Sequence, residues 1–486
     1  MFIKSLSISY FKGFSTPNNI LEFNIPDGVT KGSGLNIFLG ENNTGKSTIF
    51  EALHFLRDET KDTNAIKNKL LDGTQPNHSS VEVVFCGDIE QVIENFAPDN
   101  KKSSFKKFIF ETDKLKSVRN TENPTIIRFW NESENKYDNP SGIGAPFKKL
   151  FDNNFIWADT NPSTEASFGA STMCGTLLKE IALSHTTTTE YQNFTQQFNN
   201  IFNNPLSTLR QTIQEVENKI KTVFSNQFGN ADIRFHFDNL DITSYFKNAE
   251  LMINDGIETA MTEKGQGMQR AIALALLQVY AETIAHDKEK NATKPFFIFI
   301  DEPEICLHPI GQKKLLEALL EISKDKQVFI TTHSPYFLIS PHLKNAGLFV
   351  FKNTNHSNSA ERMSNSNYLF PYSPSWGEIN YRAYNIPTIE LHNELYGTLQ
   401  EKSGKFQEKQ FEQWLVNPSF GNLSMSKNWT RENNGQPQSP YSVTLQTFIR
   451  NHIHHPENRT MQNDFYTYDE LKQSIDEMIV ILKSLP

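Results

Sequence analysis

Residues 34–53 read GLNIFLGENNTGKSTIFEAL, and this stretch predicts the fold. It begins with an apolar run of strand length, continues through a loop rich in glycine and asparagine, and ends with the spacing of a helix. Within it, Gly40-x-x-x-x-Gly45-Lys46-Ser47 matches a phosphate-binding loop, or P-loop. A strand before the loop and a helix after it form the context that this motif requires, so we predict a nucleotide site here.

Glycine lets successive backbone N–H groups of such a loop turn toward phosphate oxygens, and the start of the helix adds its dipole. Lys46 is expected to reach the β- and γ-phosphates of ATP, and Ser47 to bind Mg²⁺. The nucleotide-binding residues that we predict are Gly40, Glu41, Asn42, Asn43, Thr44, Gly45, Lys46, Ser47 and Thr48.

Residues 294–309, KPFFIFIDEPEICLHP, contain a second apolar strand that ends in two acidic residues. Ligands of doubly wound sheets bind at the carboxyl ends of the strands, where Asp301 and Glu302 would lie. We expect Asp301 to hold Mg²⁺, directly or through water, and Glu302 to accept a proton from the attacking water.

Two further stretches extend the predicted site. Residues 327–338, QVFITTHSPYFL, form a buried strand followed by His333, which can sense a γ-phosphate. Residues 263–277, EKGQGMQRAIALALL, form a glycine-containing turn that opens an apolar helix, and helix starts favour anions. The predicted catalytic residues are therefore Lys46, Glu302 and His333, and the turn adds Gly265, Gln266 and Gly267.

These four elements, in this order, resemble the ABC-type ATPase heads of the RecF, SMC and OLD families. The FKGF stretch at residues 11–14 also resembles the first strand and turn of those heads. Lys264 and Gln266 depart from the Ser-Gly-Gly-Gln signature of transporters. The Gly-x-Gly-x-Gln-Arg form found here is instead similar to OLD-type and related bacterial defence ATPases.

The resemblance implies that the signature turn acts in trans. Two heads would meet head-to-tail and bury two ATP molecules, each between one P-loop and the partner's Gly265–Gly267 turn. It also implies an oligomer that opens and closes with ATP hydrolysis, with a role in antiviral defence.

The order of elements predicts an α/β fold: an ABC-ATPase head with a parallel sheet, an inserted helical and mixed lid region, and a mainly helical C-terminal domain. The expected parts are the N-terminal lobe with the P-loop (1–87), the insertion (88–240), the rest of the head (241–352), a polar linker (353–375) and a helical effector or docking domain (376–486).

The insertion contains two notable patterns. Apolar residues of residues 206–223 follow helical spacing after Pro205 and predict a helical arm packed on the body. Residues 101–119 carry seven Lys or Arg residues against two acidic residues, with phenylalanines between them. This segment is either a nucleic-acid patch or a hairpin with one solvated basic face and one buried phenylalanine face.

The bulk properties narrow the class of protein. The chain has 486 residues and a net charge of −9, which argues against a protein coated in nucleic acid, so any nucleic-acid binding must use a local patch. Three separated cysteines exclude a disulfide framework and suit the reducing cytoplasm. No apolar run approaches the ~20 residues that cross a bilayer, so we expect no membrane partner.

Residues 448–458, FIRNHIHHPEN, lie near the end of a predicted helix. Arg450-Asn451-x-x-x-His455 resembles the Arg-x4–6-His motif of HEPN ribonucleases, and an ABC head followed by such a domain resembles the PrrC and RloC anticodon nucleases. The possible ribonuclease site consists of Arg450, Asn451, His454 and His455, with DNA or tRNA as possible partners. The same residues also suit a polar helix end.

Two other functions remain open at this stage. The C-terminal helices could dock a separate nuclease, as in Septu- or PARIS-like systems, which would make the chain a scaffold or sensor ATPase. A RecF-like DNA-repair clamp is the other, although the chain lacks a long coiled coil. Residues 350–486 show no strand that ends in Asp-x-Asp, so a Toprim nuclease domain of the OLD kind is not predicted.

Overall fold

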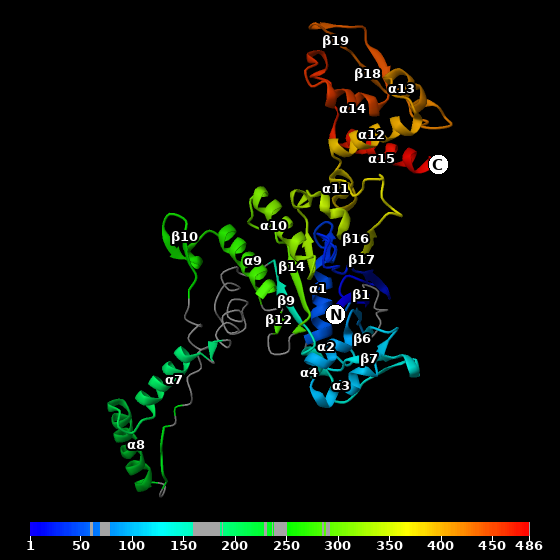
Figure 1. Cartoon of the computed structure of the whole chain (residues 1–486). Helices are drawn as coiled ribbons and strands as arrows, with labels where there is room; N and C mark the ends of the chain where they lie inside the picture. Colours follow the sequence, from blue (N-terminus) through cyan, green and yellow to red (C-terminus); the bar gives the residue numbers. More distant parts are fainter. Residues whose placement is uncertain are drawn as a thin grey trace. The chain divides into compact units, whose positions relative to one another are not determined.

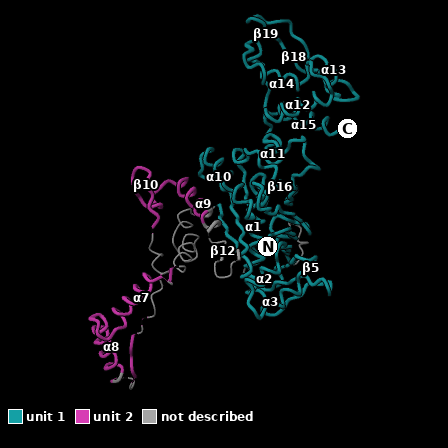
Figure 2. Tube along the Cα trace, in the orientation of Figure 1, with its two compact units in different colours: residues 1–158, 287–486 teal, residues 159–286 magenta. Residues whose placement is uncertain are grey.

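The computed structural model describes residues 1–58, 62–68, 78–158, 185–186, 188–227, 231–235, 237, 250–283, 286–287 and 292–485. The chain divides into two compact units (Figures 1 and 2). Unit 1 contains residues 1–158 and 287–486, and unit 2 contains residues 159–286. Residues 88–158, which the sequence predicts to be part of the insertion, belong to unit 1 together with the P-loop.

Unit 1 is built on a core sheet whose strand order is β17-β16-β3-β15-β14-β9. Neighbouring strands from β16 to β9 run parallel, and β17 joins β16 in the antiparallel direction. The strands are β3 (Leu35–Leu39), β9 (Asp152–Ile156), β14 (Phe296–Asp301), β15 (Gln327–Thr332), β16 (Gly347–Thr354) and β17 (Ser357–Met363). Every residue of β3 and β15 is buried, as expected for parallel strands covered on both faces. The predicted α/β class is confirmed.

Helix α1 (Lys46–Asp58) lies between the core sheet and a second, antiparallel sheet. On one side, the ring of Phe50 packs 5.9 Å from Phe38 of β3 and 5.4 Å from Phe299 of β14. On the other side, the ring of Phe55 lies 6.1 Å from Phe11. Burying each such side chain contributes about 1.5–3 kcal/mol, so α1 is held firmly at the end of the P-loop.

The antiparallel sheet has the order β2-β1-β4-β6-β7-β8, with β5 paired to β6. Its strands are β1 (Phe2–Ser9), β2 (Asn19–Glu22), β4 (Ser80–Cys86), β5 (Ile109–Phe110), β6 (Lys114–Asn120), β7 (Arg128–Asn131) and β8 (Lys136–Asp138). Short helices accompany it: α2 (Ile89–Phe96), α3 (Asp99–Lys106), the 3-10 turn η1 (Glu132–Glu134) and α4 (Gly144–Lys148). Residues after 88 belong here because β6 pairs with β4 along its whole length.

The basic segment 101–119 spans α3, β5 and β6. Its contacts favour the interpretation with a buried phenylalanine face over the nucleic-acid patch. Phe105 and Phe108 are buried in the core of the antiparallel sheet. Arg119 is buried, and its Nε donates to the carbonyl of Leu56 at 2.9 Å. Four lysines form ion pairs with nearby carboxylates: Lys102, Lys106, Lys114 and Lys116. Because these charges are matched within the fold, the segment does not offer a row of free cations to nucleic acid.

Residues 353–375 were predicted as a linker, but residues 357–363 form β17 at the edge of the core sheet. An edge strand exposes one side to water and tolerates Ser, Asn and charged residues. This composition gives the segment the appearance of a loop in the sequence. Residues 364–375, which form neither helix nor strand, then lead into the C-terminal helices.

Unit 2 contains two long helices, α7 (Thr189–Phe202) and α8 (Thr208–Gln227), and a hairpin of β10 (Met252–Asn254) and β11 (Glu258–Ala260). The 3-10 turn η3 (Met261–Glu263) leads into α9 (Gln266–Thr283). The pair β12 (His286–Asp287) and β13 (Ala292–Thr293) follows where the chain returns from unit 2 to unit 1. The predicted helix is present as α8, but most of its apolar stripe is exposed: Leu209, Val216, Ile220 and Val223. These four side chains are therefore not buried in a core of unit 2.

The C-terminal part of unit 1 is mainly helical, as predicted. Its helices are α11 (Trp376–Tyr384), α12 (Ile389–Ser403), α13 (Glu408–Val416), α14 (Leu445–His454) and α15 (Tyr468–Ser484). The short strands β18 (Lys427–Trp429), β19 (Glu432–Asn433), β20 (Gln436–Pro437) and β21 (Tyr441–Val443) pair as β18–β21 and β19–β20, and η6 (Arg459–Met461) precedes α15. Thr467 and Glu470 form a capping box at the start of α15.

Helix α10 (Pro309–Ile322) and the 3-10 turns η4 (Pro335–Leu338) and η5 (Pro341–Asn345) complete the described elements. None of the helices in the described part of the chain is both long and apolar enough to span a bilayer.

Candidate nucleotide-binding site

The P-loop connects β3 to α1, and its glycines are required by backbone geometry. Gly40 and Gly45 have φ angles of 144° and 91°, in the region that side chains disfavour. A Cβ at Gly40 would lie 2.4 Å from the carbonyl oxygen of Phe351, and a Cβ at Gly45 would lie 2.4 Å from Nδ2 of Asn358. Asn43, at φ 63°, adopts a left-handed conformation that asparagine tolerates.

Lys46 and Thr44 fix the shape of this loop. Lys46 is buried, and its Nζ donates to the carbonyls of Gly40 at 2.9 Å and Glu41 at 2.8 Å. The hydroxyl of Thr44 also donates to the carbonyl of Glu41, at 2.8 Å. Burial lowers the pKa of Lys46, while the nearby carboxylates, Glu302 first, oppose that shift. The side chains of Glu41, Asn42 and Asn43 are exposed, and Thr48 is buried in α1.

Ser47 and Asp301 meet beside the P-loop although they are far apart in the sequence. The hydroxyl of Ser47 donates to Oδ1 of Asp301 at 2.8 Å, and the hydroxyl of Thr331 donates to the same oxygen at 2.5 Å. Mg²⁺ prefers a few hard oxygen ligands from the protein and takes the rest from phosphates and water. The Ser47 and Asp301 oxygens fit that requirement. Among the described residues no cluster of three or more His, Cys, Asp or Glu side chains provides a fuller metal site.

Glu302 and His333 come from the ends of neighbouring strands, β14 and β15. Oε1 of Glu302 lies 3.2 Å from Nδ1 of His333, with 22% and 42% of the two side chains exposed. Glu302 has a left-handed backbone, at φ 47°, and its N–H donates to Oγ1 of Thr331 at 3.0 Å. This strained backbone turns Glu302 out of the line of β14. Thr331 orients both acidic residues, because its hydroxyl contacts the carboxylate of Asp301 and the N–H of Glu302.

Glu304 is a part of the site that we did not predict. Its Oε1 accepts hydrogen bonds from the Thr332 hydroxyl at 2.7 Å and from the N–H groups of His333 and Ser334 at 3.0 and 3.2 Å. Burial is the main cause that raises the pKa of this carboxyl. Glu304 thus holds the histidine loop from behind. The third acidic residue of the DEPE stretch was the available sequence signal, since an acid two residues after Glu302 had no assigned role.

Asn358 is a second unpredicted residue and lies under the P-loop. It comes from β17, its side chain is buried, and its backbone N–H donates to the carbonyl of Gly13 at 2.8 Å. A Cβ at either Gly13 or Gly45 would lie within 2.5 Å of its Nδ2 atom. Close packing of Asn358 explains why both positions require glycine. No local pattern in the polar segment 353–375 signals this role.

The signature turn lies in unit 2. Gly265 precedes α9, and Gln266 and Gly267 begin that helix. Nε2 of Gln269 donates to the carbonyls of Thr262 at 3.1 Å and Lys264 at 2.7 Å, which fixes the turn from inside. A Cβ placed on Gly265 would meet no atom within 4 Å. The outer side of the turn is therefore open.

The residues of the possible ribonuclease site lie on and after α14. Nη1 of Arg450 donates to Oδ1 of the buried Asn451 at 2.9 Å, and Nδ2 of Asn451 donates to Glu408 at 3.4 Å. His454 is exposed on the last turn, and His455 caps the helix, with its Nδ1 3.3 Å from Oε1 of Glu457. The intervening His452 is instead buried among aromatic rings.

Residues 155–338 match the AAA ATPase domain family. The chain is 26% identical over 362 residues to the Old nuclease of Escherichia phage P2, an alignment that covers 71% of this chain and 58% of the phage protein. The chain therefore spans well under two thirds of that relative.

Two solved SMC head structures are also similar. One is an SMC head bound to the C-winged helix domain of ScpA, with a TM-score of 0.44, 16% identity, and coverage of 75% of this chain and 98% of that chain. The other is the SMC head domain from Thermotoga maritima, with a TM-score of 0.38, 14% identity, and coverage of 75% and 100%.

Proposed function

We propose that this chain is an ABC-type ATPase of the RecF, SMC and OLD kind that binds ATP with Mg²⁺, hydrolyses it, and uses the cycle to control an effector; the match to the AAA ATPase domain family and the similarity to an Old nuclease support this. The observation that carries this proposal is the hydrogen-bonded group of Ser47, Asp301 and Thr331 beside the P-loop lysine, with Glu302 and His333 next to it. This arrangement provides a cation, two hard oxygen ligands and a base.

Each residue has a distinct task in this proposal. Lys46 and the loop N–H groups bind the β- and γ-phosphates, and Ser47 and Asp301 hold Mg²⁺, which neutralises charge on those phosphates. Glu302 accepts a proton from water as the water oxygen bonds to the γ-phosphorus and the bond to the bridging oxygen breaks. His333 lies beside Glu302 and contacts the γ-phosphate. ADP and phosphate then leave.

The proposal includes a dimer around ATP. The open side of Gly265 supports an approach of this turn to a nucleotide on a second copy, because a backbone without side chains can come close to phosphates. Each of the two composite sites then contains one P-loop and one signature turn from different copies.

The effector under control is a nuclease in this proposal, in the context of defence against phage. The support is the similarity to a phage protein named for its nuclease activity, and the chain spans only 58% of that protein's length. A separate nuclease that docks on the C-terminal helices is the alternative to a nuclease site within them.

The test compares Lys46→Ala with Glu302→Gln. Lys46→Ala removes the fixed cation of the P-loop and should abolish ATP binding. Glu302→Gln keeps the shape of the side chain but removes the base, so it should bind ATP and fail to hydrolyse it. Gel filtration with ATP should then show a dimer for Glu302→Gln and none for Lys46→Ala. Equal elution of both variants, with and without ATP, would contradict ATP-driven dimerisation.

A second candidate function is RNA cleavage by the C-terminal domain. The observation that favours it is the spacing on α14, where the exposed His454 lies one helical turn after Arg450. Partial desolvation first, and then the charges of Arg450 and His455, lower the pKa of the His454 imidazole. A neutral imidazole one helical turn from an arginine can deprotonate a 2′-hydroxyl while the guanidinium binds the phosphate.

RNA cleavage is tested with tRNA, purified protein and ATP. Arg450→Ala, His454→Ala and His455→Ala should each be compared for cleavage and for ATPase activity. Loss of cleavage with normal ATPase activity, and products with 2′,3′-cyclic phosphate ends, would support the ribonuclease. Full cleavage by all three variants would assign it to other residues or to a contaminant.

A further inference from the structure

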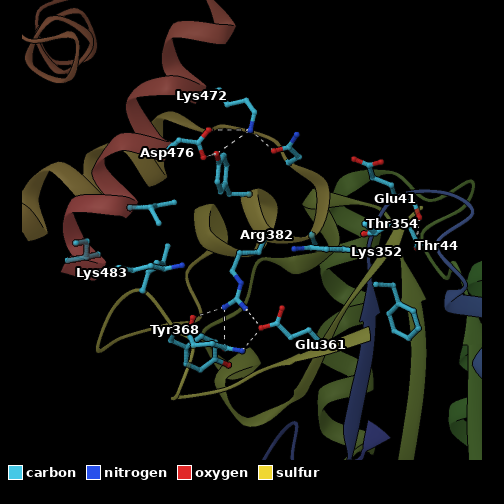
Figure 3. Close-up of a pocket in the computed structure, with 18 of the residues that line it drawn as sticks. Glu41, Thr44, Lys352, Thr354, Glu361, Tyr368, Arg382, Lys472, Asp476 and Lys483 are labelled. Atoms are coloured by element: carbon cyan, nitrogen blue, oxygen red, sulfur yellow. Dashed lines mark hydrogen bonds and ion pairs between the residues drawn. The ribbon is translucent and has the colours of Figure 1, made fainter. Parts of the chain in front are cut away.

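A large cavity lies within unit 1 between the core sheet and the C-terminal helices (Figure 3). Its volume is about 930 Å³. One wall comes from the P-loop, β16 and β17, and the opposite wall comes from α11, α12 and α15. This cavity is not the predicted nucleotide site, although Glu41 and Thr44 of the P-loop border it.

The walls of the cavity carry more positive than negative charge. The cationic side chains exceed the carboxylates by five to three. The cations are Lys352, Arg382, Lys402, Lys472 and Lys483, and the carboxylates are Glu41, Glu361 and Asp476. The excess contrasts with the whole chain, whose net charge is −9. Positive charge is therefore concentrated here against the overall balance of the protein.

Two of these cationic side chains, Arg382 and Lys472, already have carboxylate partners within the fold. Arg382 lies 3.4 Å from Glu361 and 3.6 Å from the buried carboxylate of Glu378. Lys472 lies 3.6 Å from Asp476, and its Nζ donates to Oδ1 of Asn385 at 2.7 Å. These contacts fix the walls and leave little positive charge available at either residue.

The remaining three cationic side chains of the cavity are lysines, and they have no such partners among the residues that the structure describes. Lys352, Lys402 and Lys483 form no ion pair with any residue in the described part of the chain. They come from three separate elements, β16, α12 and α15. Lys352 and Lys483 extend their ammonium groups into the cavity from opposite sides (Figure 3). Like charges repel across a shared space, so an anionic ligand would remove a repulsion that the fold otherwise maintains.

We propose that this cavity binds a phosphate-bearing ligand through Lys352, Lys402 and Lys483. Lysine binds phosphate as a point charge and does not need the planar geometry that arginine requires. Three ammonium groups on separate elements suit several negative charges spaced along one molecule, as in a nucleic-acid backbone or a polyphosphate. The cavity volume is within the range of small-molecule sites, roughly 300–1,000 Å³.

Binding here would be linked to the nucleotide site through the P-loop. Glu41 and Thr44 border the cavity, while the carbonyl of Glu41 also accepts hydrogen bonds from Thr44 and Lys46. Any effect of the ligand on ATP affinity must be matched by an equal effect of ATP on ligand affinity. The site itself does not depend on ATP hydrolysis, so it can be tested in a variant that lacks P-loop function.

The test uses the full chain with Lys46→Ala in every sample, so that phosphates cannot bind through the P-loop lysine. One probe is a fluorescent single strand of about twelve nucleotides, as DNA and as RNA, measured by anisotropy. The other probe is inorganic tripolyphosphate, measured by calorimetry. The cavity variant carries Lys352→Gln and Lys483→Gln. The matched control carries Lys405→Gln and Lys409→Gln, which remove the same charge from exposed lysines that do not line the cavity.

Binding of at least one probe should weaken about tenfold in the cavity variant and less than about twofold in the control. For the single strand, the slope of log affinity against log salt should fall by about 1.4, since each lost phosphate contact removes about 0.7. Loss of single-strand binding identifies a nucleic-acid ligand, and loss of tripolyphosphate binding alone identifies a free polyphosphate. If neither probe binds, or if cavity and control variants bind equally, the proposal is wrong.

Discussion

The phenol of Tyr384 donates a hydrogen bond to the carbonyl oxygen of Thr332 at 3.2 Å. Tyr384 ends α11, and Thr332 is the residue before His333. At the other end of the histidine loop, Nε1 of Trp376, also in α11, donates to the carbonyl of Pro335 at 2.8 Å. One helix of the C-terminal part thus holds both ends of the loop that carries His333. Movement of this loop and movement of α11 are physically joined.

We expect Tyr384→Phe to loosen this connection without emptying the space that the ring fills. The free energy of unfolding should fall by about 1 kcal/mol, the net value of one hydrogen bond. The kcat of ATP hydrolysis should change by about two- to thirtyfold, which corresponds to about 0.5–2 kcal/mol of altered coupling. Steady-state ATPase assays and urea unfolding measure the two effects.

Tyr396→Phe is the matched control for Tyr384→Phe. Tyr396 is also buried in a C-terminal helix, but its hydroxyl pairs with Thr447 at 2.9 Å, within the C-terminal core. It should lower stability by a similar amount and leave kcat unchanged. If both variants change kcat equally, general destabilisation and not the loop contact is responsible.

Thr331→Val should impair magnesium use. Valine keeps the shape of threonine but removes the hydroxyl that donates to Asp301 and accepts from the N–H of Glu302. A buried donor left without a partner costs about 1–3 kcal/mol. The kcat should fall, and the Mg²⁺ concentration for half-maximal ATPase activity should rise. Thr331→Ser restores the hydroxyl and should recover both values; failure of this rescue would show that packing is the cause.

Gly265→Leu should leave ATP binding by a single copy intact and lower turnover. A side chain at Gly265 meets no neighbouring atom within its own fold, so the fold tolerates it, whereas a second copy's nucleotide would be obstructed. Mixing Gly265→Leu with Lys46→Ala should restore part of the ATPase activity, since hybrid dimers contain one complete site. With subunit exchange verified, an absence of recovery would contradict the trans arrangement.

His392 should make the stability of the protein depend on pH. Its imidazole is buried and 3.0 Å from Oγ of Ser474, and burial lowers its pKa from 6.5 to about 3. Below pH 6.5 the His392 imidazole takes up a proton in the unfolded chain but not in the folded chain. Its contribution to the free energy of unfolding is therefore complete above pH 6.5 and is lost as the pH falls from 6.5 toward 3. In that window His392→Gln should reduce the slope of stability against pH by up to about 1.4 kcal/mol per unit.

Ser474→Ala separates burial from hydrogen bonding as the cause. It removes the hydroxyl beside His392 and keeps the imidazole in the core, so the slope should remain close to that of the wild type. Urea unfolding between pH 4 and 8 gives both slopes. An unchanged slope in His392→Gln would show that other groups determine the acid sensitivity of the chain.

The nucleotide site was predictable because its signals are local. The P-loop needs only a strand, a glycine loop and a helix, all within residues 34–53. Asp301 and His333 each follow an apolar run, and the ends of parallel strands lie at one edge of a sheet. The structure places β14 and β15 side by side, which brings Glu302 and His333 to 3.2 Å.

The missed features depend on contacts between distant parts of the chain. Strand β17 is polar because it lies at a sheet edge, and only its pairing with β16 distinguishes it from a loop. Asn358 contacts the P-loop from that strand, more than 300 residues away in the sequence. Residues 88–158 resembled an insertion because β6 is recognisable only through its pairing with β4.

The strand order of the core sheet also determines when ATP can first bind during synthesis. Leu39, the last residue before the P-loop, pairs with Thr332 of β15 on one side and with Val350 of β16 on the other. A ribosome adding about 5–20 residues per second needs roughly 15–60 s to reach Val350 after Leu39. The antiparallel sheet finds all its strands within the first 138 residues and can form early. The P-loop is therefore synthesised long before β15 and β16, the two strands that pair with β3. The apolar strand β3 has neither partner strand through most of translation.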